Sequence, residues 1–227
     1  SADSVELLIN GVQTYDALIA AFGQATHHIH LEYYIFEPDH TGVRIRDSLI
    51  EQAKRGIKIR LLLDRLGSKN ASEAFLRPLQ QAGAEIAFFH PFFFKRLWRP
   101  EINLRSHRKI VVIDGTIGFT GGINITDDEN EHIKKDAYID LHFKIRGEIV
   151  RWLQLAFVAD WLYAGGQFAA DTLYFPVPAE SVGPIAAQVL AAGPDTPFEP
   201  IHRAQVFAIN SACKRVLLVT PYFVPSE

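Results

Sequence analysis

The sequence predicts an α/β fold in which helices cover both faces of a mixed central sheet. Two observations lead to this prediction: strand-like and helix-like segments alternate along the chain, and several of the strands are apolar on both faces. The chain has 227 residues, of which 48% are hydrophobic and 22% are charged, so it can bury a substantial core. Its single cysteine excludes an intrachain disulfide.

The expected elements follow one another in a regular order. The strands are short runs rich in β-branched and aromatic residues, and the helices carry an apolar stripe. The expected strands are residues 5–9, 28–36, 57–63, 85–89 and 138–145. The expected helices are residues 15–24, capped by Thr14, 43–55, 71–81, where Pro78 indicates a kink, and 148–163.

A change of composition divides the chain. Residues 165–200 are rich in Gly, Pro and Ala, which indicates a connection. Beyond it, residues 214–223 (KRVLLVTPYF) resemble residues 27–36 (HHIHLEYYIF), about 187 positions earlier, as the start of an internal repeat does. We therefore expect a first unit at 1–164, a connection at 165–184 and the beginning of a second, truncated unit at 185–227. Two unrelated α/β strands are the alternative interpretation.

The segment from Ser106 to Gly115 (SHRKIVVIDG) carries the most chemistry. Its apolar run predicts a strand, and side chains two apart on a strand point to the same face. His107 would then lie beside Lys109, placing a group able to attack phosphorus next to a cation able to hold a phosphate oxygen. Histidine suits this task because its ordinary pKa of about 6.5 leaves it neutral near pH 7.

A hairpin brings a second group of residues to the same place. Asp114-Gly115 is a strong hairpin-turn signal, and residues 116–120 form the expected returning strand. The loop Gly121-Gly122-Ile123-Asn124 then lies near His107. An ordinary exposed edge strand that carries a histidine and a lysine is the alternative.

His107, Lys109 and Asp114 match the H-x-K-x4-D signature of the phospholipase D superfamily, and the Gly-Gly-x-Asn loop follows where that family places it. The chain most resembles the bacterial cardiolipin synthases, over nearly its whole length. The resemblance is carried by residues 28–36, 64–68, 106–115 and 220–225. Two stretches depart from the family pattern: residues 137–142, where Trp-Arg-Asp usually precedes the histidine, and the charged residues 127–136.

The resemblance implies a phospholipase D-like layered α/β/α fold built from two similar halves, with the site between them. It implies that one histidine of a pair forms a covalent phosphohistidine while its partner protonates the leaving glycerol; which of the two is His107 stays open. Among the signature residues implied to be catalytic, His107, Lys109 and Asp114, we expect the aspartate to have an orienting or structural role without direct contact with the substrate. Asn124 and Gly122 would hold the phosphate, with no metal or other cofactor.

Other residues are weaker candidates. His27, His28 and His30 could suggest a metal, but we favour hydrogen-bonded polar residues near the site. Glu32 shares a strand face with two of these histidines and either supports the active-site histidines or is an ordinary surface residue. Asp64 follows an apolar strand, where α/β sites gather, but loop capping explains it equally well. Tyr222 and Glu227 would line the far half of the site, on family resemblance alone.

The aromatic and basic stretch 88–105 suits either a rim that dips into a lipid surface or a set of core residues. The resemblance implies phosphatidylglycerol or another anionic phospholipid as substrate. It also implies a place at the bacterial cytoplasmic membrane, peripheral or anchored by a region not present here. The partner of the site would be a second half in the same chain or a homodimer partner. A net charge of −3 argues against nucleic acid.

The function expected from these residues is a phosphatidyltransferase that makes cardiolipin from two phosphatidylglycerols. A phospholipase D-type hydrolase, a homodimeric nuclease with one signature per chain, and a non-catalytic lipid-binding half are the alternatives. The hydrolase is the nearest of these because water competes with alcohols for the same intermediate. By itself, this chain would be inactive unless two copies pair their His107 segments.

Overall fold

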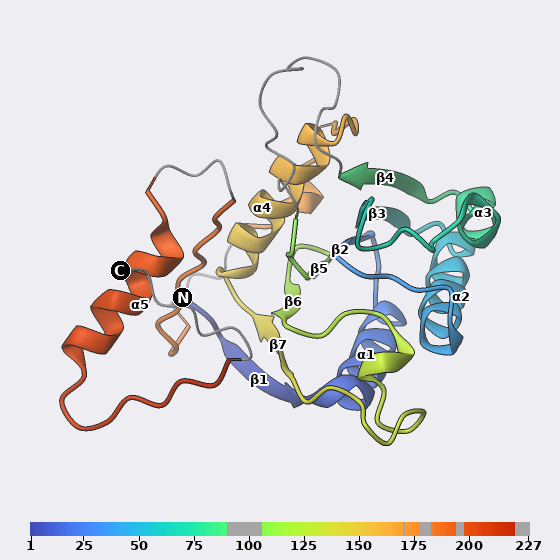
Figure 1. Cartoon of the computed structure of the whole chain (residues 1–227). Helices are drawn as coiled ribbons and strands as arrows, with labels where there is room; N and C mark the ends of the chain where they lie inside the picture. Colours follow the sequence, from blue (N-terminus) through green and yellow to red (C-terminus); the bar gives the residue numbers. More distant parts are fainter. Residues whose placement is uncertain (90–105, 170, 178–182, 194–197, 221–227) are drawn as a thin grey trace, which may run out of the picture. The chain divides into compact units, whose positions relative to one another are not determined.

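The computed structural model describes residues 1–89, 106–169, 171–177, 183–193 and 198–220. The chain forms two compact units, Ser1–Val189 and Leu190–Glu227. The first unit contains a seven-stranded sheet with the spatial order β1-β7-β6-β5-β2-β3-β4 (Figure 1). Its strands are β1 (Ser4–Ile9), β2 (His28–Tyr33), β3 (Lys58–Asp64), β4 (Glu85–Phe89), β5 (Ile110–Ile113), β6 (Ile117–Gly121) and β7 (Leu141–Arg146).

The sheet is mixed, as the sequence predicts. β2, β3 and β4 run parallel to one another. β5 pairs antiparallel with β2 and β6, and β7 pairs antiparallel with β6 and β1. The parallel strands are joined by helices, because a parallel pair needs a crossover connection. The helices of the first unit are α1 (Asn10–Phe22), α2 (His40–Lys54), α3 (Glu73–Gln81) and α4 (Val150–Tyr163), with the 3-10 turns η1 (Asp127–Glu129) and η2 (Thr172–Tyr174).

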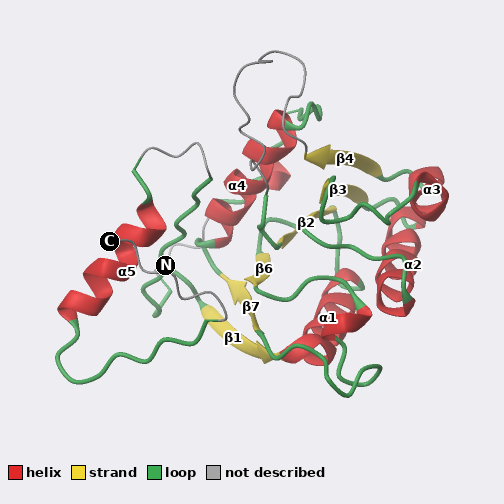
Figure 2. Ribbon diagram, in the orientation of Figure 1, coloured by secondary structure: helices red, strands yellow, loops and turns green. Residues whose placement is uncertain are grey.

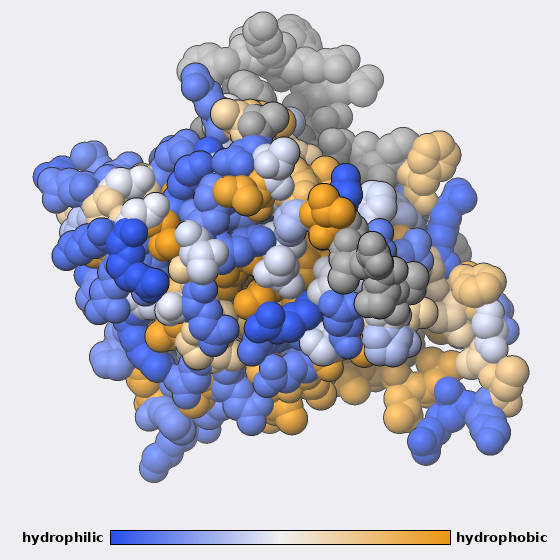
Figure 3. Space-filling model, turned by 180° about the vertical axis from the view of Figure 1, so that it is seen from behind, coloured by the Kyte–Doolittle hydropathy of each residue, from blue (hydrophilic) through white to orange (hydrophobic). Residues whose placement is uncertain are grey.

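Two hydrophobic clusters lie on opposite faces of the sheet, which makes the unit a three-layer structure (Figure 2). Helices α1, α2 and α3 cover one face and contribute Phe22, Leu49 and Leu79 to its hydrophobic cluster. Helix α4 covers the other face with Phe157 and Trp161. The predicted layered α/β/α fold is therefore confirmed. The outer surface over α1 to α3 is mostly hydrophilic, as expected for amphipathic helices that bury one side (Figure 3).

The first helix begins earlier than expected. Thr14 is not its cap; it lies in the first turns of α1, buried, with its Oγ1 donating to the carbonyl oxygen of Asn10 at 2.9 Å. Asn10 has a positive φ of 63°, which turns the chain directly from β1 into α1. The side chain of Gln13 accepts from the N–H of Ile9 at 2.8 Å. Within the first turn, the N–H of Val12 donates to Oε2 of Glu131 at 3.1 Å, so a side chain from a distant segment supplies the bond expected of Thr14.

The described residues of the second unit, 190–193 and 198–220, contain one helix, α5 (Pro200–Ser211). Helix α1 shifted by the 187-residue offset of the expected repeat would cover residues 197–209, close to where α5 lies. The assignment of residues 185–227 to a second phospholipase D-like half remains a prediction. None of the side chains of α5 is buried. A helix with an apolar side needs other elements to cover it.

Candidate active site

The predicted hairpin is present and positions the site. β5 and β6 pair from Ile110–Thr120 to Ile113–Ile117, and Asp114 and Gly115 form the turn with φ values of 51° and 65°. These left-handed conformations suit a tight hairpin and explain the Asp-Gly pair. The turn lies at one end of β5, and the H-x-K residues lie at the other. The returning strand therefore delivers the Gly121–Asn124 loop to the end where His107 lies.

His107 and Lys109 are not on the strand itself. The ladder of β5 with its neighbours begins at Ile110, so residues 106–109 form an extended lead-in segment, and the prediction of a strand through His107 is wrong. Beyond Thr120, the returning strand pairs with β7 alone, Gly121 lying opposite His142, so the lead-in segment has no partner strand to extend the ladder. Side-chain contacts hold it instead.

Tyr34, just beyond the end of β2, supports both signature residues. Its ring stacks on the exposed ring of His107, with centroids 3.9 Å apart and an interplanar angle of 18°. The Nζ of Lys109 lies 5.6 Å from the Tyr34 ring centroid and donates to the carbonyl oxygen of His107 at 2.9 Å. This role of Tyr34 was not predicted from the sequence. The aromatic pair Tyr33-Tyr34 at the end of a strand was the available signal.

The glycine loop is packed too tightly for side chains. The N–H of Gly122 donates to the carbonyl oxygen of Leu141 at 2.9 Å. A Cβ on Gly122 would lie 2.1 Å from Oδ2 of Asp140, so only glycine allows this approach. Asp140, the aspartate of the family's Trp-Arg-Asp pattern, thus lies against the loop, although the two residues before it differ from that pattern.

Asn124 is buried, and its polar atoms already have partners. Its Nδ2 donates to Oε1 of Glu129 and its backbone N–H donates to Oε2, both at 2.7 Å. Its Oδ1 accepts from the N–H of Ile35 at 3.2 Å. Glu129 belongs to the stretch 127–136 that we interpreted as a charged departure, yet it is buried and burial raises the pKa of its carboxyl. No sequence signal distinguishes it from its exposed neighbours.

Lys109 lies among charges of opposite sign. Burial lowers the pKa of its ammonium, and the carboxylates of Glu129 and Asp140 oppose that shift. His142 lies nearby with its side chain fully buried, and neither of its ring nitrogens has a hydrogen-bond partner among the described residues. Burial lowers the pKa of His142 to about 3, with a further contribution from the charge of Lys109. His142 is therefore neutral near pH 7.

Asp114 lies at the far end of β5 from His107 and acts on the fold. Its Oδ2 accepts from the N–H and Oγ1 of Thr26, both at 2.8 Å. Its Oδ1 accepts from the N–H groups of His27 and His28, both at 2.9 Å. Burial alone would raise the pKa of this carboxyl, but these bonds bring it below its usual value. These four bonds hold residues 26–28 against the hairpin turn, which is a structural role, and the orienting role of Asp114 stays a prediction.

We expect the Asp114→Asn variant to be destabilised by about 1–3 kcal/mol, because the amide nitrogen of asparagine must face backbone N–H donors. Asparagine adopts positive φ as readily as aspartate, so the variant isolates the hydrogen bonds from the turn conformation. Urea unfolding of the two proteins measures the difference. An unchanged midpoint would mean that these bonds contribute nothing to stability.

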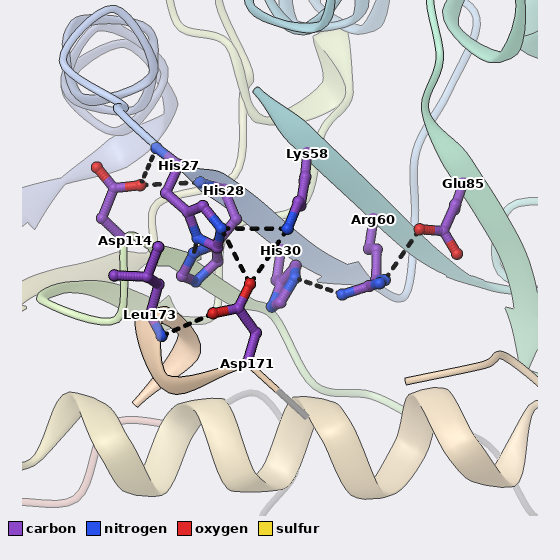
Figure 4. Close-up of polar contacts among 9 residues, drawn as sticks. All are labelled: His27, His28, His30, Lys58, Arg60, Glu85, Asp114, Asp171 and Leu173. Atoms are coloured by element: carbon purple, nitrogen blue, oxygen red, sulfur yellow. Dashed lines mark hydrogen bonds and ion pairs between the residues drawn. The ribbon is translucent and has the colours of Figure 1, made fainter. Parts of the chain in front are cut away.

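His27, His28 and His30 form a separate cluster, drawn in Figure 4. The Nδ1 atoms of His27 and His28 are 2.9 Å apart, and Nε2 of His27 lies 3.3 Å from Oδ2 of Asp171. The same carboxylate oxygen accepts from Lys58 at 3.2 Å. The described residues contain no group of three or more acidic, histidine or cysteine side chains arranged to hold a metal ion.

The inner part of this cluster is buried under η2. His30 lies 3.2 Å from Oε1 of Gln154 through Nδ1 and 3.3 Å from Arg60 through Nε2, a pattern that suits a neutral imidazole donating at one nitrogen and accepting at the other. The ring of Tyr174 covers it, with centroids 5.2 Å apart. These histidines were expected near the site, but His28 begins β2 and Tyr34 follows its end, about 20 Å further along the strand.

Glu32 lies between these two places, with its side chain buried on the α4 side of β2. It accepts a hydrogen bond from Oγ of Ser106, directly before His107. Of the two expected alternatives, this contact favours support of the site over an ordinary surface residue. Asp64 instead caps its own loop, accepting from the N–H groups of Leu66 and Gly67 at 2.9 and 2.8 Å. Glu227, Tyr222 and most of the aromatic stretch, residues 90–105, lie outside the described residues.

Comparison with solved structures defines the class of the fold. Nuc from Salmonella typhimurium, a phospholipase D family member, aligns with a TM-score of 0.51 and 17% identity, covering 71% of this chain and 93% of that one. A phosphatidylserine synthase from Haemophilus influenzae aligns with a TM-score of 0.56 and 17% identity, covering 71% of this chain and 37% of that one. At this level of identity the likeness shows a phospholipase D-like fold.

Sequence comparison places the chain more narrowly. The profile of the family described as "Cardiolipin synthase, PLD-like domain" matches residues 18–161, and the chain belongs to this family. It is 41% identical to cardiolipin synthase 1 of Bacillus cereus over 99% of its length, and 42% identical to the cardiolipin synthase of a Geobacillus species over 100%. It spans 45% of the length of each of these relatives.

Proposed function

We propose that this chain is the first half of a phosphatidyltransferase that makes cardiolipin and glycerol from two molecules of phosphatidylglycerol. The observation that supports the proposal most is the pairing of His107 and Lys109 at the open end of the hairpin, in a chain about 40% identical to cardiolipin synthases. A second phospholipase D-like half, in the same chain or from a second copy, would supply the other histidine.

The proposed reaction has two displacements at phosphorus. A ring nitrogen of one histidine attacks the phosphatidyl phosphorus, and the bond from phosphorus to the glycerol oxygen breaks. The partner histidine gives that oxygen its proton, so glycerol leaves. The same histidine then takes the proton of a hydroxyl on a second phosphatidylglycerol, whose oxygen attacks phosphorus and breaks the phosphorus–nitrogen bond. Cardiolipin is released and both histidines return to their starting states.

The remaining residues have supporting roles in the proposal. The ammonium of Lys109 offsets the charge that builds on the phosphate oxygens. Gly122 lies on the same loop, where the close approach of Asp140 requires a residue without a side chain. Asn124 already bonds to Glu129 through one amide hydrogen and retains a second hydrogen for a phosphate oxygen.

The substrate places the reaction at a membrane surface. Phosphatidylglycerol is a bilayer lipid, and the relatives at about 40% identity are bacterial cardiolipin synthases, so we propose action at the bacterial cytoplasmic membrane. None of the described helices is long and apolar enough to span a membrane.

The test uses the full-length natural protein with phosphatidylglycerol vesicles in the presence of a chelator, and identifies products by mass spectrometry. We expect cardiolipin and glycerol in equal amounts. Phosphatidic acid without cardiolipin would identify a hydrolase. DNA cleavage without lipid turnover would identify a nuclease, and neither activity would leave a lipid-binding half.

The covalent step has its own test. The protein is mixed with lipid labelled at phosphorus, quenched in denaturant and analysed on a gel. We expect an acid-labile label on a histidine. A protein that makes cardiolipin without such a label would contradict the phosphohistidine route.

A further inference from the structure

His107 precedes β5, whose ladder begins at Ile110, so contacts outside the ladder must hold its segment in place. The residues on either side of it are both anchored. Ser106 is buried and donates from Oγ to Oε1 of Glu32 on β2. Arg108 forms an ion pair with Asp160 on α4. The segment that carries His107 is thus attached to two different layers of the fold.

The two carboxyl groups that hold these anchors meet each other. Glu32 is 1% exposed, and the carboxyl group of Asp160 lies close enough to interact with it. Its Oε2 has no donor among the described residues, and a carboxylate oxygen can bond to a second carboxylate only if one of them carries a proton. Burial, and next the charge of Asp160, raise the pKa of Glu32 well above its ordinary value.

Charge counting gives the same result. Among the described residues Arg108 is the cation paired with Asp160, and two ionised carboxylates beside it would leave a net negative charge in a buried place, which is costly. One proton on the pair makes the group neutral with Arg108 and lets Glu32 and Asp160 share a hydrogen bond. The contact joins two layers, because Glu32 lies on β2 and Asp160 lies near the end of α4, the helix that covers this face (Figure 1).

We propose that Glu32 and Asp160 share one proton and, by holding Ser106 and Arg108, act as positioning residues that aim His107 at phosphorus. This inference rests on the proposed function for its catalytic part. Neither carboxyl touches the lipid. Their effect reaches His107 through the backbone that joins it to Ser106 and Arg108. The ring of His107 also stacks on Tyr34.

Loss of the contacts that Glu32 and Asp160 make with Ser106 and Arg108 should lower kcat more than it weakens lipid binding. A nucleophile displaced by about 1 Å from its line of attack costs about 100-fold in rate, whereas lipid binding depends on other contacts. The matched pair of variants is Glu32→Gln and Glu32→Leu. Glutamine has nearly the same shape as protonated glutamate and can accept from Ser106 while donating to Asp160; leucine can do neither.

In the full-length natural protein we expect Glu32→Gln to keep kcat within about threefold of the parent, and Glu32→Leu to lose about 100-fold in kcat with little change in KM. Two results would overturn the proposal. One is a Glu32→Leu protein with parental kcat. The other is a Glu32→Gln protein as slow as the leucine variant, because that would mean that an ionised Glu32 is needed.

Two readouts do not depend on activity. The infrared carbonyl band of a protonated carboxylic acid should lose intensity at neutral pH in Glu32→Gln relative to the parent. Ser106→Ala removes one anchor at little risk to the fold and should speed hydrogen exchange of the amides at 107–109 by about tenfold. An unchanged band, or unchanged exchange, would refute the shared proton or the anchor. If the parent makes no cardiolipin, the proposed function fails, while these readouts still decide whether the pair exists.

Discussion

The His107→Gln variant of the full-length protein is expected to lose phosphatidyl transfer by about 1,000-fold or more, because glutamine can neither form a bond to phosphorus nor carry a proton between oxygens. Glutamine keeps the polarity of the side chain and can still lie against Tyr34, so the lead-in segment should stay in place. Unfolding of the variant should therefore match that of the parent, and the loss should appear in kcat.

A control is available on the same surface. His132 is exposed in the turn after η1, so His132→Gln makes the same chemical change away from the site and should leave the rate unaltered. Rates are followed by mass spectrometry of cardiolipin from phosphatidylglycerol vesicles. A His107→Gln protein that retains a tenth of the parental rate would remove this histidine from the chemistry.

The second large effect concerns acid stability. His28, His30 and His142 are fully buried, and burial is the main cause that lowers the pKa of each, to about 3 for the first and the last. As the pH falls below 6.5, these histidines bind protons in the unfolded chain but not in the folded chain, so the free energy of unfolding decreases. Each histidine contributes about 1.4 kcal/mol per pH unit in that window.

Two buried carboxyls act in the opposite direction. The pKa values of Glu32 and Glu129 are raised by burial, so above the ordinary carboxyl pKa the folded chain binds protons that the unfolded chain lacks. Their contribution to stability decreases as pH rises. The three histidines outnumber the two carboxyls, so we expect a net loss of stability as the pH falls from about 6 to 5.

The His142→Phe variant tests this balance. Phenylalanine keeps a ring in the same place and removes two buried nitrogens that lack hydrogen-bond partners in the described part of the chain. We expect the variant to lose about 2 kcal/mol less than the parent when the pH falls from 6.5 to 5, in urea unfolding followed by circular dichroism. Equal losses in the two proteins would mean that His142 is protonated in the folded state.

The fold and the site differ in how much of them the sequence predicts. The layered architecture and the hairpin follow from local patterns, namely the alternating strand and helix segments and the Asp114-Gly115 turn. The end of the ladder at Ile110 does not, because it depends on where the neighbouring strands diverge. The start of α1 was missed because Thr14 is a good cap by type, while the turn at Asn10 is set by the preceding strand.

The supporting residues of the site were the hardest to predict. Asp160 looks like an ordinary polar residue on the surface of α4, and only the packing of that helix on the sheet brings it to Arg108. Glu129 lies in an acidic stretch whose other members are exposed or half-buried, and its partner is the Asn124 amide. Such contacts join segments whose relation is decided by tertiary packing, which a periodic pattern does not encode.

The residues that follow α4 have a consequence for where the first half ends. Composition alone suggested a boundary at Ala164, yet Asp171 accepts from Lys58 and Tyr174 lies 2% exposed over the histidine rings. Residues 171–174 are therefore part of the cover over the first half's own interior. Cleavage after Ala164 that displaced this cover would expose His28 and His30 to water, so the folded half could protonate them and its stability would depend less on pH in acid than that of the intact protein.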